Sequence, residues 1–250
     1  MFILASTQVF AWKPIMIGHR GCRMGVENTE QAFINGVDVY GFQGLECDVK
    51  VTKDGHYVCW HDDNIPNDKI SNRNYDVAIA SNLLKDLQDL DLTQTRNSVS
   101  YTGKICTVDR YLEICKQKNV IPVIELKSNT TICNENMTGF PGLYELIVKH
   151  GLESKAIILT SMSQSLVYIK NNYPSLKRQY LVNYIDDTKI EFCKTNCCDL
   201  SSSYYYNSSH KVTQELADKC HNAGIKLAIY TVNNIDYYNS YAKYGASYVT

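Results

Sequence analysis

Short aliphatic and β-branched runs alternate along this chain with amphipathic stretches, and this alternation limits the possible folds more than any other feature. It is typical of a parallel sheet covered by helices, because parallel neighbours need a crossover connection. The eight expected strands are Ile15–Gly18, Gly44–Val51, Val120–Leu126, Ala156–Thr160, Gln179–Asn183, Cys198–Ser202, Lys226–Thr231 and Ser247–Thr250. Eight strands in 250 residues fit a closed sheet better than an open one. The sequence therefore predicts an α/β fold, a (β/α)8 TIM barrel.

The residues that bound the amphipathic stretches favour helices between these strands. Asn28 is expected to be the N-cap of a first helix, with Gly41 just beyond its end. Asn is a preferred N-cap residue, and Gly readily adopts the left-handed conformation that ends helices. A second helix is expected to begin at Thr107 and a third to stop at Gly224.

Residues 63–105 break the alternation. They are polar and rich in Asn, Asp and Ser, and only Val77–Ala80 and Leu83–Leu92 have apolar content. A long stretch without a barrel pattern inside a compact domain often has a function of its own. We expect one domain over residues 1–250, with residues 63–105 inserted as a small subdomain or lid.

Charge and hydropathy exclude several classes of protein. The formal net charge is −1, which disfavours a broad nucleic-acid-binding face. No run approaches the roughly 20 apolar residues of a membrane-spanning helix. The N-terminal run MFILASTQVFAW lacks the basic leader and long apolar core of a signal peptide. We expect a cytoplasmic protein without stable membrane insertion; its oligomeric state does not follow from the sequence.

The ten cysteines are expected to be reduced. Most fall in apolar runs, where a thiol packs as a small hydrophobic group, and a domain of this size needs no disulfides. Cys193, Cys197 and Cys198 lie close together in the sequence, but they lack a C-x-x-C pair and a nearby His. A soft-metal site is therefore not expected there.

Titratable residues gather where the expected strands end. The active sites of TIM barrels lie at the carboxyl ends of the strands. His19 follows the first strand, and Glu46 and Asp48 on the second are two residues apart, so their side chains share a face. Further candidates are His61, at the end of a return strand over His56–Trp60, and Glu125 and Lys127, at the end of the third strand.

Three converging carboxylates would repel one another unless a cation lay between them. Oxygen ligands from Glu46, Asp48 and Glu125 suit Mg²⁺ or Ca²⁺ better than Zn²⁺, which prefers His and Cys. A single inward-facing carboxylate more often pairs with Lys or Arg than with a metal. Because three of them meet at one end of the barrel, we predict a divalent metal site.

The remaining polar residues favour phosphoryl chemistry. His19 and His61 are free for proton transfer, and Arg20 and Lys127 can hold an anion. A lone histidine is more often a structural hydrogen-bonding residue than a catalyst. A metal site, anion-binding cations and an acid/base pair in one place together point to phosphodiester hydrolysis.

Two runs of the sequence resemble the signature of the glycerophosphodiester phosphodiesterases. They are GHRGCRMGVENTEQAF and GLECDVKVTKDGHYVCWHD. The elements of the signature stand here as His19-Arg20-Gly21, Glu27-Asn28-Thr29, Glu46/Asp48, Thr52/Asp54-Gly55 and His61-Asp62. Fainter similarity continues at Glu125-Leu126-Lys127 and Thr231-Val232-Asn233, so the resemblance spans nearly the whole chain.

The resemblance implies a TIM barrel with an insertion after the His-Asp element that covers the site. It implies cleavage of a small-molecule glycerophosphodiester, such as glycerophosphocholine, to sn-glycerol 3-phosphate and an alcohol. The implied roles are His19 and His61 as acid/base pair, Glu46, Asp48 and Glu125 as ligands of Ca²⁺ or Mg²⁺, and Arg20 and Lys127 as phosphate contacts. For Asn28, Gly55 and Gly21 we expect structural roles: a helix cap, a turn and a close backbone approach.

The sequence also departs from the family pattern. Val26 stands where Pro is common, and Tyr230 stands where Trp is common. Tyr230 and Asn233 are expected to form a wall of the substrate site. Residues 63–68, DNIPND, replace an Arg- and Thr-rich continuation, so the leaving alcohol stays open.

Two alternatives remain. The first is a lipid phosphodiesterase of the lysophospholipase D or sphingomyelinase D type, which would need an apolar groove for acyl chains. The polar residues 63–105 favour a small deacylated substrate instead. The second is a barrel that binds a phosphorylated ligand without turning it over, although both histidines and all three carboxylates are present.

Overall fold

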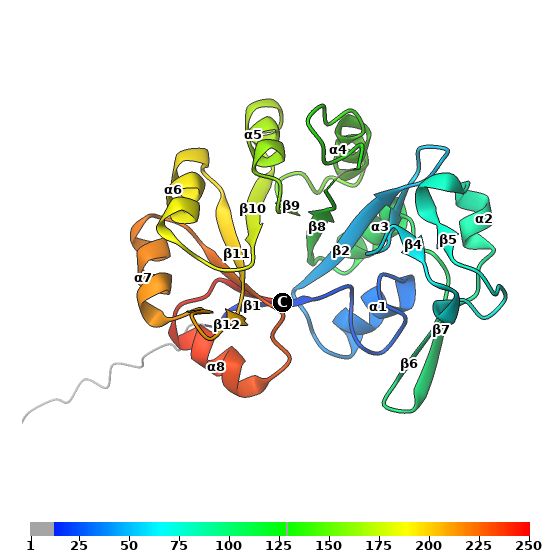
Figure 1. Ribbon diagram of the computed structural model, residues 1–250, viewed down its shortest axis with the longest axis horizontal. Helices are drawn as coiled ribbons and strands as arrows, with labels where there is room; N and C mark the ends of the chain where they lie inside the picture. Colours follow the sequence, from blue (N-terminus) through cyan, green and yellow to red (C-terminus); the bar gives the residue numbers. More distant parts are fainter. Residues whose placement is uncertain (1–12, 129) are drawn as a thin grey trace, which may run out of the picture.

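The computed structural model describes residues 13–128 and 130–250, and the N-terminal run discussed above as a signal peptide lies outside them. Eight parallel strands close into a barrel in the order β1-β2-β8-β9-β10-β11-β14-β15, with β1 paired to both β2 and β15 (Figure 1). Their bounds are β1 Ile15–Gly18, β2 Gly44–Val51, β8 Ile121–Leu126, β9 Ile157–Thr160, β10 Lys177–Val182, β11 Asp199–Ser203, β14 Leu227–Tyr230 and β15 Tyr248–Val249. The predicted TIM barrel is confirmed.

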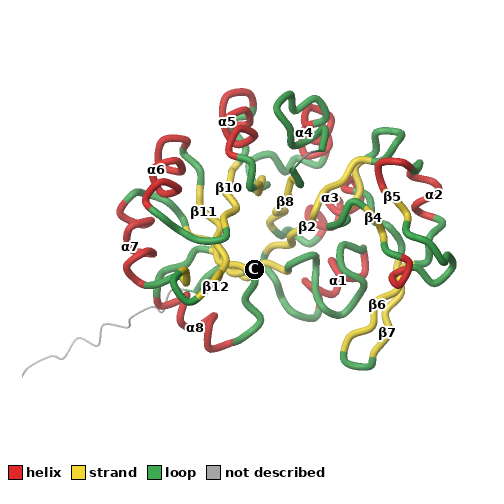
Figure 2. Tube along the Cα trace, in the orientation of Figure 1, coloured by secondary structure: helices red, strands yellow, loops and turns green. Residues whose placement is uncertain are grey.

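Helices alternate with the barrel strands and surround them (Figure 2). They are α1 Glu30–Asp38, α3 Val108–Gln117, α4 Phe140–Lys149, α5 Ser163–Asn172, α6 Asp187–Asn196, α7 Gln214–Asn222 and α8 Ile235–Lys243. The second predicted helix begins as expected, since the Thr107 side chain accepts a hydrogen bond from the Arg110 backbone N–H and caps α3. A short hairpin of β12 (Tyr205–Asn207) and β13 (His210–Lys211) precedes α7.

The start of α1 differs from the sequence prediction. The helix begins at Glu30 with Thr29 as its N-cap residue, so the prediction that Asn28 is the N-cap is wrong. Asn28 has a positive φ of 60° and is buried, and its side chain bonds to Asp48 instead of the helix end. Gly21 makes the expected close approach, because a Cβ there would lie 2.6 Å from the backbone of Ala32.

The barrel interior has an apolar floor with polar residues above it. Ile17, Val123 and Leu159 belong to a buried apolar cluster, as expected for a barrel whose interior is filled by side chains. Glu46 and Asp48 lie further along β2, toward the carboxyl ends of the strands. The short strand β3 (Tyr57–Cys59) returns antiparallel beside β2 and carries the chain to His61.

Residues 63–105 contain β4 (Asn64–Ile65), η1 (Asn67–Lys69), β5 (Val77–Ala78), η2 (Ile79–Ser81), α2 (Leu84–Gln88), β6 (Leu92–Arg96) and β7 (Val99–Gly103). Despite its polar composition, this segment has a buried cluster of its own that includes Ile65, Leu87 and Leu92. Trp60, which directly precedes His61, packs into the same cluster and is 1% exposed. The segment lies beside the barrel next to α1, and its β6-β7 hairpin projects outward (Figure 1).

All ten cysteines are free thiols, and only Cys197 among them is exposed. All the buried ones except Cys22 pack into the apolar clusters between the barrel and its helices, as predicted for reduced cysteines. None of the helices in the described part of the chain combines the length and the apolar character that crossing a bilayer would require.

Candidate active site

A cavity of about 250 Å³ opens at the carboxyl ends of the barrel strands. It brings together seven of the residues singled out from the sequence: His19, Arg20, Glu46, His61, Glu125, Lys127 and Tyr230. Asp48 is wholly buried beside them, and one carboxylate oxygen of Glu46, of Asp48 and of Glu125 lie within 4.8 Å of one another. The charged residues come from the loop directly after β1, from the middle of β2, from the end of β8 and the residue after it, and from the turn after β3.

Glu46 has the feature that most favours a bound cation. Its Oε2 accepts a hydrogen bond of 2.8 Å from the Arg20 backbone N–H, but its buried Oε1 has no hydrogen-bond partner. Burial raises the pKa of Glu46 well above its ordinary value, and the carboxylates of Asp48 and Glu125 raise it further. An unpartnered buried carboxylate oxygen facing two other carboxylates is costly. The three residues therefore fit a hard divalent ion, which takes oxygen ligands.

Asp48 is the centre of the charged network. Its Oδ2 lies 3.2 Å from Arg20 Nε, and its Oδ1 lies 2.7 Å from Lys127 Nζ. Asn28 donates to Oδ2 at 2.8 Å and accepts from the Asp48 backbone N–H at 3.2 Å. Burial would raise the pKa of Asp48, but Lys127 and Arg20 hold it below its ordinary value. Asp48 therefore stays ionised, and its carboxylate is held in one orientation.

Lys127, which was expected to contact phosphate, pairs with two of the carboxylates. Its Nζ contacts both Asp48 and Glu125. Burial would lower the pKa of Lys127, but these two carboxylates raise it above its ordinary value. The ammonium group thus neutralises part of the acidic cluster while it lines the cavity.

The two histidines line the same cavity. His61 Nδ1 lies 2.7 Å from Asp62 Oδ1, which orients the ring and leaves Nε2 for proton transfer. The hydrogen bond from His61 holds the pKa of Asp62 below its ordinary value. His19 is open to solvent at the cavity mouth, yet the surrounding protein desolvates its ring and Arg20 repels its charged form, so the pKa of His19 lies below its ordinary value.

The two residues expected to form a substrate wall lie in different places. The Tyr230 ring lines the cavity, and its hydroxyl donates to the Val182 carbonyl at 2.8 Å. Burial raises the pKa of Tyr230 to about 12. Asn233 lines a neighbouring cavity of about 400 Å³. His19 and Thr231 line both cavities.

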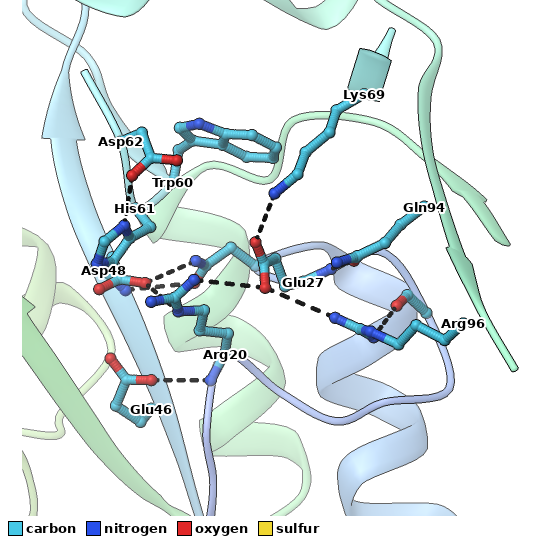
Figure 3. A network of polar contacts seen from close by, with 12 residues as sticks. Arg20, Glu27, Glu46, Asp48, Trp60, His61, Asp62, Lys69, Gln94 and Arg96 are labelled. Carbon is cyan, nitrogen blue, oxygen red and sulfur yellow. Dashed lines mark hydrogen bonds and ion pairs between the residues drawn. The ribbon is translucent and has the colours of Figure 1, made fainter. Parts of the chain in front are cut away.

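Sequence reasoning missed three polar residues near the site. Asn28 was assigned to a helix end, although its contact with Asp48 spans 20 positions. Lys69 and Arg96 come from residues 63–105 and meet Glu27, next to Arg20 (Figure 3). No pattern indicated these two, because their positions depend on how the 63–105 segment folds.

Replacing Asn28 is expected to weaken both the fold and the site. Asn28→Gly keeps the positive φ accessible and removes only the two hydrogen bonds to Asp48, and we expect a loss of about 1–3 kcal/mol in the free energy of unfolding. Asn28→Ala adds the backbone strain of a left-handed residue, a further 1–2 kcal/mol or so. Urea unfolding of the two variants measures both quantities, and equal stability of Asn28→Gly and the original protein would contradict this role.

Comparison with known proteins agrees with the fold and gives the family of the chain. The model of the Glycerophosphoryl diester phosphodiesterase family matches residues 19–249. The match and the fold define a phosphoric diester hydrolase built on a TIM barrel. The chain belongs to the glycerophosphoryl diester phosphodiesterase family. A curated relative, the glycerophosphodiester phosphodiesterase of Caldanaerobacter subterraneus subsp. tengcongensis, is 27% identical over 228 residues, which cover 88% of this chain and 86% of the relative.

Two solved structures have the same fold. The Oleispira antarctica phosphodiesterase, determined in complex with its product sn-glycerol-3-phosphate, superimposes with a TM-score of 0.78 at 21% identity and covers 95% of this chain and 92% of its own. A glycerophosphodiester phosphodiesterase from Parabacteroides distasonis gives a TM-score of 0.75 at 19% identity, with 96% and 92% covered.

Proposed function

We propose that this protein is a metal-dependent glycerophosphodiester phosphodiesterase that hydrolyses substrates such as glycerophosphocholine to sn-glycerol 3-phosphate and an alcohol. The observation that carries the proposal is that two histidines line one cavity with Glu46 and Glu125, which form a cluster of three carboxylates with the buried Asp48 beside it. Family membership supports it, and so does the Oleispira antarctica phosphodiesterase, whose product is sn-glycerol-3-phosphate.

In the proposed reaction, His19 and His61 transfer the protons. Over the whole hydrolysis, the oxygen of a water molecule bonds to phosphorus while the bond from phosphorus to the leaving alcohol oxygen breaks. One histidine accepts a proton from the water, and the other donates a proton to the alcohol oxygen. The hydrogen bond between Asp62 and His61 Nδ1 holds that ring in one orientation for this transfer.

Charge on the phosphate would be met by the groups around the carboxylates. Glu46, Asp48 and Glu125 would hold Ca²⁺ or Mg²⁺, which would supply positive charge toward the phosphate oxygens. We propose Arg20 and Lys127 as further phosphate contacts, since both are cations held at the cavity by Asp48. Tyr230 would form an apolar wall beside the substrate.

Purified protein is expected to release sn-glycerol 3-phosphate from glycerophosphocholine, to lose this activity in EDTA, and to regain it with Ca²⁺ or Mg²⁺. A coupled assay for glycerol 3-phosphate measures each step. Activity that persists after complete metal removal would reject metal dependence. Hydrolysis of lysophosphatidylcholine with none of glycerophosphocholine would instead favour a lysophospholipase D, and a panel of leaving alcohols would define the specificity.

A further inference from the structure

Glu27 lies among three cations from two separate parts of the chain (Figure 3). Its Oε2 is 3.4 Å from Arg20 and 3.6 Å from Arg96, and its Oε1 accepts a hydrogen bond of 3.0 Å from Lys69 Nζ. The Glu27 side chain is 16% exposed. We call Glu27, Arg20, Lys69 and Arg96 the Glu27 cluster.

The Glu27 cluster joins the loop after β1 to the 63–105 segment. Arg20 belongs to that loop, whereas Lys69 ends η1 and Arg96 ends β6. Two contacts of the backbone reinforce the junction: the Glu27 N–H donates to Gln94 Oε1 at 3.0 Å, and Arg96 donates to the Gly25 carbonyl at 2.8 Å. Among the described residues, Glu27 is the only carboxylate within ion-pair distance of Lys69 or Arg96.

The charge balance of the cluster depends on this one carboxylate. Burial would raise the pKa of Glu27, but Arg20, Lys69 and Arg96 hold it below its ordinary value, so Glu27 carries its charge. Without that charge, three cations would face one another in a partly buried place and would repel. Arg20 is shared with the site, because its Nε also lies 3.2 Å from Asp48.

We propose that Glu27 is a positioning residue that fastens the 63–105 segment to the loop after β1 and keeps Arg20 turned toward the carboxylate cluster. Glu27 lines the neighbouring cavity of about 400 Å³ and not the one lined by Glu46 and Glu125, so its link to the carboxylate cluster runs through Arg20, which contacts both Glu27 and Asp48. The kinetic consequence rests on the proposed function, in which Arg20 contacts the substrate phosphate. The structural consequence is that residues 63–105 stay attached to the loop after β1, and this attachment can be measured without an activity assay.

The test uses Glu27→Gln, which keeps the shape of the side chain and removes its charge. Hydrogen exchange of residues 63–105, followed by mass spectrometry, is expected to become about tenfold faster. The reason is that losing a charged hydrogen bond makes local opening of the segment about tenfold more frequent. With glycerophosphocholine, KM is expected to rise about tenfold while kcat changes less. A residue with only a structural role would lower the melting temperature without this split between KM and kcat.

Lys69→Met and the double variant identify the route. If Glu27 fastens residues 63–105 through its contact with Lys69, the double variant should exchange no more than about twofold faster than Glu27→Gln alone, because the effects of contacting residues are not additive. Asp38→Asn is the matched control. It breaks the ion pair of Asp38 with Lys118, 2.7 Å long, away from the cavity, and should change neither exchange in the segment nor KM.

Unchanged exchange and unchanged KM in Glu27→Gln would overturn the inference, as would fully additive effects in the cycle. If Glu27→Gln does not fold, Lys69→Met alone carries the exchange measurement. If the original protein hydrolyses no glycerophosphodiester, the proposed function fails, and the exchange measurements still decide whether Glu27 fastens the segment.

Discussion

Replacing His61 by Ala is expected to lower kcat on glycerophosphocholine by a factor of about 10²–10⁴, the usual contribution of a positioned general acid or base. His61 follows a buried Trp60 and is held by Asp62, so the substitution removes a fixed proton-transfer group and little packing. His19→Ala is expected to have an effect of the same order. Steady-state kinetics with saturating metal measure both losses.

Two further variants separate the contribution of the His61 ring from that of its partner Asp62 and from the general effect of losing a histidine: Asp62→Asn and His56→Ala. Asp62→Asn removes the charged partner of His61 and is expected to cost less than loss of the ring itself. His56→Ala removes a histidine whose ion-pair partner is Asp54, at 3.7 Å, on the turn before β3, and should leave kcat unchanged. Turnover by His61→Ala or His19→Ala at the original rate would refute the proposed acid/base pair.

Glu46→Gln is expected to abolish the stabilisation of the protein by metal ions. A ligand that binds only the folded state raises the free energy of unfolding by about 2.7 kcal/mol at a hundred times its Kd, so Ca²⁺ or Mg²⁺ should raise the melting temperature by several degrees. Without the Glu46 carboxylate this increase should vanish. Thermal unfolding with and without EDTA measures it, and Glu113→Gln, on the exposed pair with Arg110, is the control.

The original protein is expected to have a characteristic pH dependence of stability in EDTA, which Glu46→Gln removes. Because burial raises the pKa of Glu46 in the folded protein, the folded state binds more protons than the unfolded state above the ordinary pKa of Glu, about 4.3. The stability of the metal-free protein should therefore fall as pH rises from there toward the folded-state pKa. Glu46→Gln lacks this decline. A metal response of unchanged size in Glu46→Gln would count against the carboxylate cluster as the metal site.

Much of the barrel was predictable because its strands are buried on both faces and appear as near-continuous apolar runs. The two ends of each expected barrel strand lie within two residues of the ends of the observed strand, and those of β1 and β2 match at both ends. The positions of Glu46 and Asp48 followed from strand alternation, since residues two apart share a face. Strand periodicity places these two carboxylates on one face but carries no information about the ion they bind, so the metal is a proposal.

The errors arose where tertiary contacts outweigh local preference. Asn28 is of a residue type that is preferred at N-caps, but its side-chain amide donates a hydrogen bond to Asp48 on β2 instead. The buried cluster of the 63–105 segment was hidden because residues such as Ile65, Ile79 and Leu92 follow neither a helical nor a strand period. Lys69 and Arg96 could not be placed near the site before that segment was folded.

The charged groups of the cavity lie on or directly after β1, β2, β8 and β3, which are neighbours in the sheet. The strands on the far side, β9 to β11, contribute Leu159, Gln179, Leu181 and Ser201 to the same cavity. One arc of the barrel thus carries the groups assigned to chemistry, and the opposite arc carries neutral lining. Substrate preference can therefore be re-engineered, or can drift in evolution, on the neutral arc while the reactive arc is left intact.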